Sequence, residues 1–380
     1  MKIVIAPDSF KGSLSSNEVS TAIKTGLKKI FPEASYTSIP MADGGEGTMD
    51  ALVQASNGTY FTEKILDPLN HLAQAKWGLL GDKKTAIIEM AQASGLQFVN
   101  SQTANPLKTS TFGTGQLIKK ALDHGVNKII IGLGGSATND AGSGMTQALG
   151  AHFLDKNGDE VKACGGNLNL IQKIDLSNLD DRLAKTAIIL ACDVSNSLIG
   201  ANGASYVFGP QKGASNEMVE LLDKNLTYFS DLVKKQLHKD YAFKAGAGAA
   251  GGLGYGLMVF ANAKIQSGVE TVLKYTNFAK KVQDADFVFT GEGASDYQTQ
   301  FGKTPFGVAK LSKRITPNCS VICLTGNMGT KIDELYGKDK IDAIFTTETG
   351  AKELRQAMKD SFDDIAIVSE NIARLIKSIR

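Results

Sequence analysis

The chain is poor in the features that mark several large classes of protein. Aromatic residues make up only 7% of its 380 residues, and 41 basic side chains balance 39 acidic ones to a net charge of +2. Proteins that bind nucleic acid usually carry a basic stripe and stacking aromatics, so we expect no nucleic-acid partner. No apolar run reaches membrane-spanning length and the opening run stops at Pro7, so we expect neither a membrane span nor a signal peptide.

Cysteine, histidine and arginine are also sparse. The four cysteines show no C-x-x-C spacing, which is typical of free thiols in a reducing compartment, and we expect a cytoplasmic protein. The four histidines are scattered, which argues against a histidine metal site or a Ser-His-Asp triad. Only five arginines occur and none lies in a motif, so no arginine clamp on a carboxylate or phosphate is visible.

The most informative segment that is present reads IIIGLGGSATNDAGSG, residues 129–144. An apolar β-branched run ends in a loop rich in glycine, and glycine lets backbone N–H groups approach a ligand closely. Successive free N–H groups before a helix form a concavity that binds anions. The segment therefore predicts a binding site for a phosphate or a carboxylate, formed by Gly134, Gly135, Ser136, Thr138 and Asn139.

Both ends of the chain alternate strand, loop and helix, which is the pattern of a parallel sheet in an α/β fold. A length of 380 residues also favours two domains. Neither end has enough strands for a stable sheet alone. Residues 1–64 and 281–380 are therefore expected to combine into one doubly wound, mostly parallel domain, with residues 65–280 inserted as a second α/β domain.

The predicted elements follow from apolar runs and their flanking loops. For the two ends we predict strands at 2–6, 36–40, 287–290, 321–324 and 341–345, and helices at 16–30, 46–55, 305–314 and 354–379. For the insert we predict strands at 86–89, 128–131 and 188–191, and a helix at 115–124.

Polar loops containing glycine or carboxylates follow most of these strands. In open α/β sheets, ligands bind at the carboxyl ends of the strands. Lys11, Lys212 and Lys303 lie in such loops and would neutralise the charge of a transferring phosphoryl group. The carboxylates of the loops suit Mg²⁺, which proteins bind through one or two carboxylates together with phosphates. They are Asp8, Asp43, Glu46, Asp140, Asp193, Glu292 and Asp296.

Two familiar phosphate motifs fit the sequence incompletely. Gly302-Lys303-Thr304 matches the end of a P-loop, but Tyr297 stands where the first glycine is required. The dinucleotide fingerprint is matched better, by Gly132, Gly134 and Ala137, with Asp155 about twenty residues further on. An NAD(P)-dependent hydroxy-acid dehydrogenase therefore stays open as an alternative.

Seven stretches of the chain, taken in order, resemble the bacterial glycerate kinase family. The resemblance spans nearly the whole chain. It implies a two-domain α/β fold and ATP-dependent phosphorylation of D-glycerate with Mg²⁺, giving 2-phosphoglycerate or 3-phosphoglycerate. The stretches are PDSFKGSLS (7–15), PMADGGEGT (40–48), IGLGGSATND (131–140), ACDVSN (191–196), FGPQKGA (208–214), GAAGGLG (248–254) and TGEGASDYQTQFGKTPFGVAK (290–310).

This resemblance implies roles for the loop residues. Asp193 or Asp8 would accept the proton of the attacking hydroxyl, and Lys11 and Lys303 would neutralise a phosphate or the glycerate carboxylate. ATP and glycerate would meet in a cleft between the two domains. The remaining assignments are Asp43, Glu292 and Asp296 as Mg²⁺ ligands, and Gly291 and Gly293 as part of the ATP site beside the loop 134–140.

The chain departs from the family pattern at one position, since Ala294 stands where the family has an arginine. If that arginine contacts an anion, the contact is missing here. A non-catalytic anion-binding relative therefore stays open as a second alternative. The sequence also leaves open which loop takes ATP and which takes glycerate, and whether the protein is a homo-oligomer.

Overall fold

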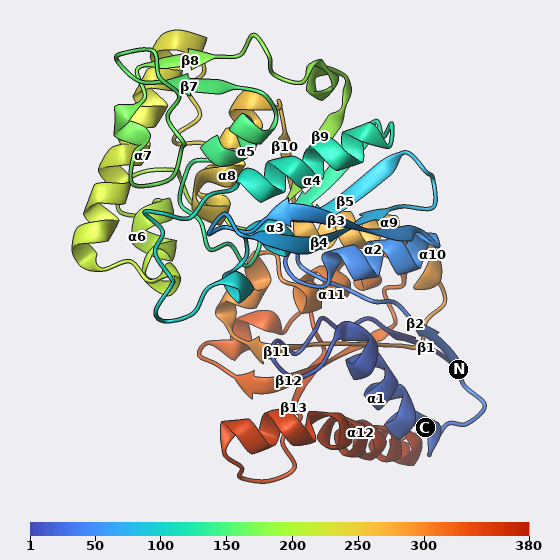
Figure 1. The fold of residues 1–380 in the computed structure, drawn as a ribbon. Helices are drawn as coiled ribbons and strands as arrows, with labels where there is room; N and C mark the ends of the chain where they lie inside the picture. Colours follow the sequence, from blue (N-terminus) through green and yellow to red (C-terminus); the bar gives the residue numbers. More distant parts are fainter. Residues whose placement is uncertain (380) are drawn as a thin grey trace. The chain divides into compact units, whose positions relative to one another are not determined.

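Strands from both ends of the chain form one parallel sheet in the computed structural model, which describes residues 1–379 (Figure 1). The strand order is β13-β12-β11-β1-β2, and every neighbouring pair is parallel. This confirms the predicted sheet, with bounds that differ by a few residues. The strands are β1 (Lys2–Ile5), β2 (Ser35–Ser38), β11 (Phe287–Ser295), β12 (Ser320–Met328) and β13 (Ala343–Thr346).

Helices cover both faces of this sheet, as a doubly wound fold requires. The helix α1 (Ser16–Lys28) begins at a capping box made by Ser15 and Glu18 and packs with α12 (Leu354–Ile379) on one face. The helix α11 (Thr304–Ile315) packs on β11 from the other face (Figure 1). Successive side chains of the central strands point to opposite faces of the sheet, and both faces are covered. These strands are therefore continuous apolar runs in the sequence.

The middle of the chain forms a second, mixed sheet with the order β10-β9-β6-β5-β4-β3. The three predicted strands of this region are present as β5, β6 and β9, which are parallel neighbours. The antiparallel pair of β3 and β4 was not predicted, because polar and charged residues interrupt its apolar pattern. The strands are β3 (Thr59–Leu66), β4 (Leu72–Leu79), β5 (Thr85–Glu89), β6 (Lys128–Gly132), β9 (Ala187–Ala191) and β10 (Lys264–Gln266).

Most helices of the middle region are short, and α4, α7 and α8 are the exceptions. The predicted helix at 115–124 is present as α4 (Phe112–Asp123), and α7 (Asn216–Leu237) is the longest. A small antiparallel sheet joins β7 (His152–Leu154) to β8 (Lys173–Asp175). The other helices of the chain are α2 (Thr48–Ser56), α3 (Ala91–Ser94), α5 (Ser143–Ala148), α6 (Ala204–Phe208), α8 (Ala249–Phe260), α9 (Gly268–Tyr275) and α10 (Phe278–Lys281).

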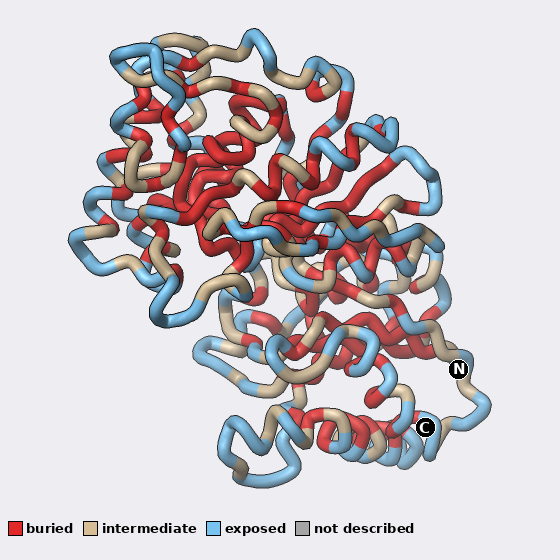
Figure 2. Tube along the Cα trace, in the orientation of Figure 1, coloured by how far each residue is buried: buried red, intermediate tan, exposed pale blue. Residues whose placement is uncertain are grey.

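The chain divides into two compact units. The first unit contains Met1–Asp43, Asp50–Ser56 and the chain from Ser267 onward, and the second contains Gly44–Met49 and Asn57–Gln266. Each unit has its own buried core, drawn in red in Figure 2. The domain boundaries at 64/65 and 280/281 stay predictions, and β3 runs across the first of them.

The structure describes the state of the cysteines and the apolar character of the helices. All four cysteines are free thiols; Cys192, Cys319 and Cys323 are buried, and Cys164 is half-buried. Among residues 1–379, no helix combines the length and the apolar character that a membrane crossing demands.

Candidate active site

A cavity of about 650 Å³ opens at the carboxyl ends of the strands in the first unit. From β1 the chain continues through α1 to β2 on one side, whereas β11 leads through α11 to β12 on the other. The strand order therefore reverses between β1 and β11, and such a switch point is where open α/β sheets bind ligands. The sequence-predicted residues that line this cavity are Asp8, Lys11, Asp43, Glu292, Gly293 and Lys303.

Asp8 follows β1 and is held at the switch point. Its N–H donates to the carbonyl of Gly291 at 2.8 Å, which ties the loop to β11. Its carboxylate accepts from the Ser9 N–H at 2.6 Å and from the Thr304 hydroxyl at 2.6 Å. Burial, together with the nearby charge of Asp43, raises the pKa of Asp8 to about 7, against the lowering effects of Thr304, Ser9 and Lys11. A carboxyl group with such a pKa can both accept and release a proton near neutral pH.

Lys11 and Asp43 bring opposite charges to the same cavity. The Lys11 Nζ lies 3.6 Å from Asp43 Oδ2, and the Lys11 side chain is 65% exposed. The attraction of Asp43 is the main cause that raises the pKa of Lys11. Lys11 therefore stays positively charged at neutral pH and is accessible to an anionic ligand.

Glu292 and Lys303 form a second charged pair. Glu292 Oε1 accepts from the hydroxyls of Ser295 at 2.9 Å and Thr299 at 2.6 Å, and its Oε2 lies 3.6 Å from the Lys303 Nζ. Burial raises the pKa of Glu292, whereas Lys303 and the two hydroxyls lower it. Lys303 is the residue immediately before α11, so its positive charge lies at the amino-terminal end of that helix, where the helix dipole is also positive.

Two further predicted residues have mainly structural contacts. Asp296 caps the short helix η5 (Tyr297–Phe301) by accepting from the Gln298 N–H at 2.8 Å, and it does not line the cavity. Gly291 is buried inside β11, where a side chain would meet the Leu324 carbonyl at 2.3 Å. Gly293 does line the cavity, between β11 and the loop after β1.

The predicted anion-binding loop, residues 134–140, lies in the second unit. Gly134 and Gly135 are exposed, whereas Ser136, Thr138 and Asn139 are buried. Gly134 is needed because a Cβ there would lie 2.7 Å from the Gly45 backbone. Two buried oxygens of this loop, Thr138 Oγ1 and Asn139 Oδ1, have no hydrogen-bond partner within residues 1–379.

Asp140 and Lys212 hold this loop in place. The buried Asp140 carboxylate accepts four hydrogen bonds, two from Thr111 and one each from the N–H groups of Gly142 and Gly144. The Lys212 Nζ donates to Ser136 Oγ at 2.7 Å and to the Thr138 carbonyl at 2.6 Å. Because the side chain is fully buried, desolvation lowers the pKa of Lys212 to about 7, although Asp140 opposes the shift.

We expect the lowered pKa of Lys212 to make the folded protein more stable as the pH rises. Between about 7 and 10.5 the unfolded chain binds the lysine proton and the folded chain does not, which contributes up to about 1.4 kcal/mol of added stability per pH unit. Lys212→Met should remove this contribution. Denaturant unfolding from pH 7 to 10 should therefore give a shallower pH dependence for the variant. Equal slopes for the two proteins would contradict a neutral Lys212.

Asp193 also belongs to the second unit. It follows β9, which is the parallel neighbour of β6, with Ala191 opposite Gly132. Asp193 and the loop 134–140 therefore leave the same edge of the second sheet. Its side chain is half-buried.

The dinucleotide fingerprint lacks its usual structural context. The helix after β6 is α5, which has only six residues and begins at Ser143, beyond the glycines. Asp155 lies in a tight turn after β7, where it accepts from the N–H groups of Asn157 and Asp159. A dinucleotide site instead needs a long helix directly after the glycines and an acidic residue at the end of the next strand of the same sheet.

Sequence reasoning missed one part of the cavity and one hydrogen-bond partner of Asp8. Thr304 was noted only as the end of the incomplete P-loop match, and its hydrogen bond to Asp8 was not predicted. The residues of α12 that line the cavity, among them Leu354 and Met358, carry no motif. The packing of α12 against α1 and the hydrogen bonds of Ser13 to the start of α12 bring them to the site.

Comparison with known proteins gives consistent matches over nearly the whole chain. The model of the glycerate kinase family matches residues 3–377. Glycerate 2-kinase of Escherichia coli (strain K12) is 48% identical over 373 residues, covering 98% of this chain and 97% of that protein. A glycerate kinase of Bacillus subtilis (strain 168) is 46% identical over 377 residues, covering 99% and 98%.

A solved structure agrees with these sequence matches. The crystal structure of a Salmonella typhimurium LT2 protein assigned as glycerate kinase 2 has a TM-score of 0.87 and 46% sequence identity. It covers 100% of this chain and 98% of that one. By these similarities of sequence and fold, the chain belongs to the glycerate kinase family.

Proposed function

We propose that the protein transfers the γ-phosphoryl group of ATP to a hydroxyl of D-glycerate. The observation that carries this proposal is the full-length similarity to proteins named glycerate kinases. The name of the Escherichia coli relative favours 2-phosphoglycerate over 3-phosphoglycerate as the product. The cavity of the first unit supports the proposal, because it combines Asp8, whose pKa is raised to about 7, with Lys11 and Lys303.

In the proposed reaction Asp8 is the general base. It accepts the hydroxyl proton of glycerate while the hydroxyl oxygen forms a bond to the γ-phosphorus. The bond from that phosphorus to the bridging oxygen breaks, and ADP leaves. Lys11 and Lys303 stabilise the negative charge on the phosphoryl oxygens, which is the main task of a protein in phosphoryl transfer. Asp193, the other predicted base, is the alternative for the proton.

The charges of the cavity favour a bound cation. Three lysines line the cavity with five carboxyl groups, so the protein alone does not neutralise a polyphosphate; the lysines are Lys11, Lys303 and Lys352, and the carboxyl groups are those of Asp8, Asp43, Glu292, Glu348 and Asp364. No group of three His, Cys, Asp or Glu residues in the described part of the chain could hold a metal by itself. Mg²⁺ fits this arrangement, because it usually takes one or two carboxylates and completes its shell with phosphates and water.

Asp43 and Glu292 are the residues that would hold Mg²⁺; Asp296, the third predicted ligand, does not line the cavity. Bound there, the ion would supply positive charge to the phosphates. The loop 134–140 of the second unit is proposed as an anion site. Its exposed Gly134 and Gly135 and the unpartnered Thr138 Oγ1 and Asn139 Oδ1 support that assignment.

The test of this function is an ADP-release assay with D-glycerate, ATP and Mg²⁺. We expect ADP to form only when glycerate is present, and phosphorus NMR of the product against both phosphoglycerates identifies the hydroxyl that reacts. Formation of NADH from glycerate and NAD would instead support the dehydrogenase. Nucleotide binding without turnover on any small hydroxy acid would indicate a non-catalytic relative.

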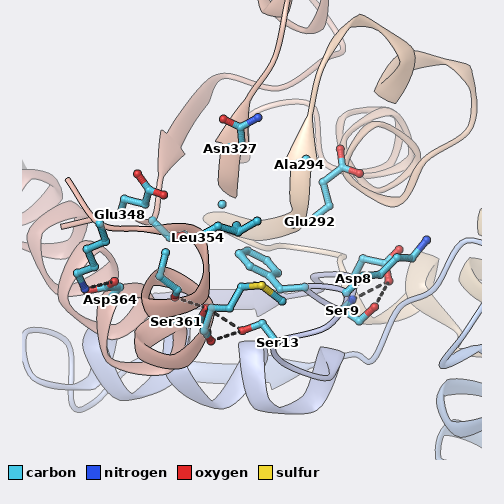
Figure 3. Close-up of a pocket in the computed structure, with 18 of the residues that line it drawn as sticks. Asp8, Ser9, Ser13, Glu292, Ala294, Asn327, Glu348, Leu354, Ser361 and Asp364 are labelled. Carbon is cyan, nitrogen blue, oxygen red and sulfur yellow. Dashed lines mark hydrogen bonds and ion pairs between the residues drawn. The ribbon is translucent and has the colours of Figure 1, made fainter. Parts of the chain in front are cut away.

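Ala294 provides a prediction about activity. It is exposed and lines the cavity near Glu292 and Asn327 (Figure 3). An arginine there would be able to reach an anion in the cavity, and a charge-assisted hydrogen bond is worth about 1.5–3 kcal/mol. We therefore expect Ala294→Arg to raise kcat/KM for glycerate by roughly tenfold or more.

The matched control is Ala294→Gln, which has a side chain of intermediate length without the charge. It should leave kcat/KM within about twofold of the wild type. Equal kinetics for the arginine and glutamine variants would show that this position does not contact a substrate anion.

A further inference from the structure

The cavity of the first unit is much larger than a three-carbon acid requires. Its volume of about 650 Å³ falls in the range of roughly 300–1,000 Å³ that is typical of sites for larger organic ligands. The charged residues of the proposed reaction occupy only one side of it. Figure 3 shows Asp8 and Glu292 on that side, with Leu354, Glu348 and Asp364 further along the cavity.

The part of the cavity away from these charged pairs has an apolar surface on α12, beside the polar side chain of Glu348 and the Lys352–Asp364 ion pair. Leu354 lines it with a side chain that is 75% exposed, and Ala357 and Met358 follow on the first turns of α12. Phe10 adds an aromatic side chain from the loop after β1. An exposed leucine inside a cavity of this size offers a surface for an apolar or aromatic ligand group.

This apolar part is rigidly connected to the charged part. Ser13, in the loop after β1, donates to the Met358 carbonyl at 2.6 Å and is hydrogen-bonded to the Ser361 hydroxyl at 2.7 Å. The segment before α12 is held in turn by Asp364, which is buried and accepts from the Thr349 hydroxyl at 2.6 Å and the Lys352 Nζ at 2.7 Å. The first turns of α12 are thus fixed relative to Lys11.

The two central strands form a wall along the cavity. The pairing of β1 with β11 ends at Ile5 and Phe289, but β11 and β12 stay paired to Ser295 and Met328. The ends of β11 and β12 therefore project as a two-stranded ribbon that presents Ala294 and Asn327. Along the sheet edge the cavity passes from the lysines and carboxylates, past the Asn327 amide, to the apolar turn of α12.

We propose that this cavity is the nucleotide site, with the purine base against Phe10, Leu354 and Met358 and the phosphates directed to Lys11 and Lys303. The proposal rests on the proposed function for the choice of ATP as the nucleotide. An end with two lysines for the phosphates, an apolar surface on α12 for the base and a polar amide between them match the three parts of a nucleotide. Glycerate lacks any group that would cover the exposed Leu354.

The decisive variant is Ala357→Trp, which fills the apolar end from a helical position. We expect the dissociation constant of the fluorescent analogue mant-ADP to rise by about tenfold or more, with the KM for glycerate changed by less than about twofold. Lys359→Trp is the matched control, since Lys359 lies on the same helix, is exposed and does not line the cavity. It should bind mant-ADP like the wild type.

A second variant removes apolar surface without a risk to folding. Because Leu354 is exposed, Leu354→Ala should leave the melting temperature unchanged, and we expect it to weaken mant-ADP binding by about threefold to tenfold. Unchanged mant-ADP affinity in both variants would overturn the proposal, and so would a rise of the glycerate KM alone. Mant-ADP binding needs no turnover, so it tests the nucleotide site even if the protein does not phosphorylate glycerate. The ADP-release assay reports that second failure on its own.

Discussion

Replacement of Asp8 by asparagine should slow phosphoryl transfer and make the protein more stable. Asparagine has nearly the same size but cannot take up a proton, and loss of a general base costs about 10²–10⁴ in kcat. We expect a decrease of that size in ADP release at saturating glycerate and ATP. The KM values should change much less, because Asp8 is proposed to act on the proton and not to anchor either substrate.

The stability of the same variant depends on pH in a defined direction. The pKa of Asp8 is raised from 3.8 to about 7, so the folded state binds more protons than the unfolded state between these values. The wild type therefore loses stability as pH rises through this window, by at most about 4 kcal/mol at 1.4 kcal/mol per pKa unit. Asp8→Asn should melt at a higher temperature than the wild type at pH 8, and the difference should vanish near pH 4.

Asp193→Asn is the comparison that assigns the base. If Asp8 is the base, this variant should keep kcat within about tenfold of the wild type, since its loss then removes no proton acceptor. A loss of about 10²–10⁴ with Asp193→Asn and little effect with Asp8→Asn would move the role to Asp193. The melting temperatures show whether either variant is simply unfolded.

Lys303→Met should reduce kcat/KM by about 10²–10³, the usual effect of removing one preorganised group that stabilises transition-state charge. The substitution also removes the attraction that lowers the pKa of Glu292, so that pKa should rise. The variant should consequently lose more of its activity at low pH than the wild type does. The measurement is a pH profile of kcat/KM for ATP in both proteins.

Lys310→Met is the control for this loss, because Lys310 lies on the same helix and is exposed away from the cavity. It should keep kcat/KM within about twofold of the wild type. A comparable decrease in both variants would mean that the effect comes from α11 and not from a charge at the cavity.

Much of the fold could be predicted from local patterns. The strands β1, β11 and β12 are apolar runs followed by loops with glycine or charged residues, and both signals are contained in a few neighbouring residues. The combination of the two chain ends followed from the small number of strands at each. By contrast, β3 and β4 have few buried positions among their polar and charged residues, so their apolar pattern is weak. Their pairing was not predicted, although Asp67, Pro68 and Asn70 between them are typical turn residues.

The candidate site could be predicted where its residues follow strands. Asp8, Asp43 and Glu292 were found because parallel strands deliver their carboxyl ends to one edge. The spacing could not show that Asp296 caps η5, or that Thr304 donates to Asp8, since both depend on how the chain bends after β11. Leu354 and Met358 could not be found because nothing in their sequence distinguishes them from an ordinary amphipathic helix.

The pairing of β1 with β11 also constrains how the protein is made. Ile3 of β1 pairs with Phe287 of β11, so most of the chain must leave the ribosome before these two central strands of the first sheet can pair. Closing so long a loop costs conformational entropy, and contacts this distant in sequence slow folding. The middle of the chain can begin to fold before β11 is made, and until then β1 has only β2 as a neighbour in the sheet. During synthesis the edge of β1 that later pairs with β11 is therefore exposed, and nascent-chain chaperones would be expected to protect it.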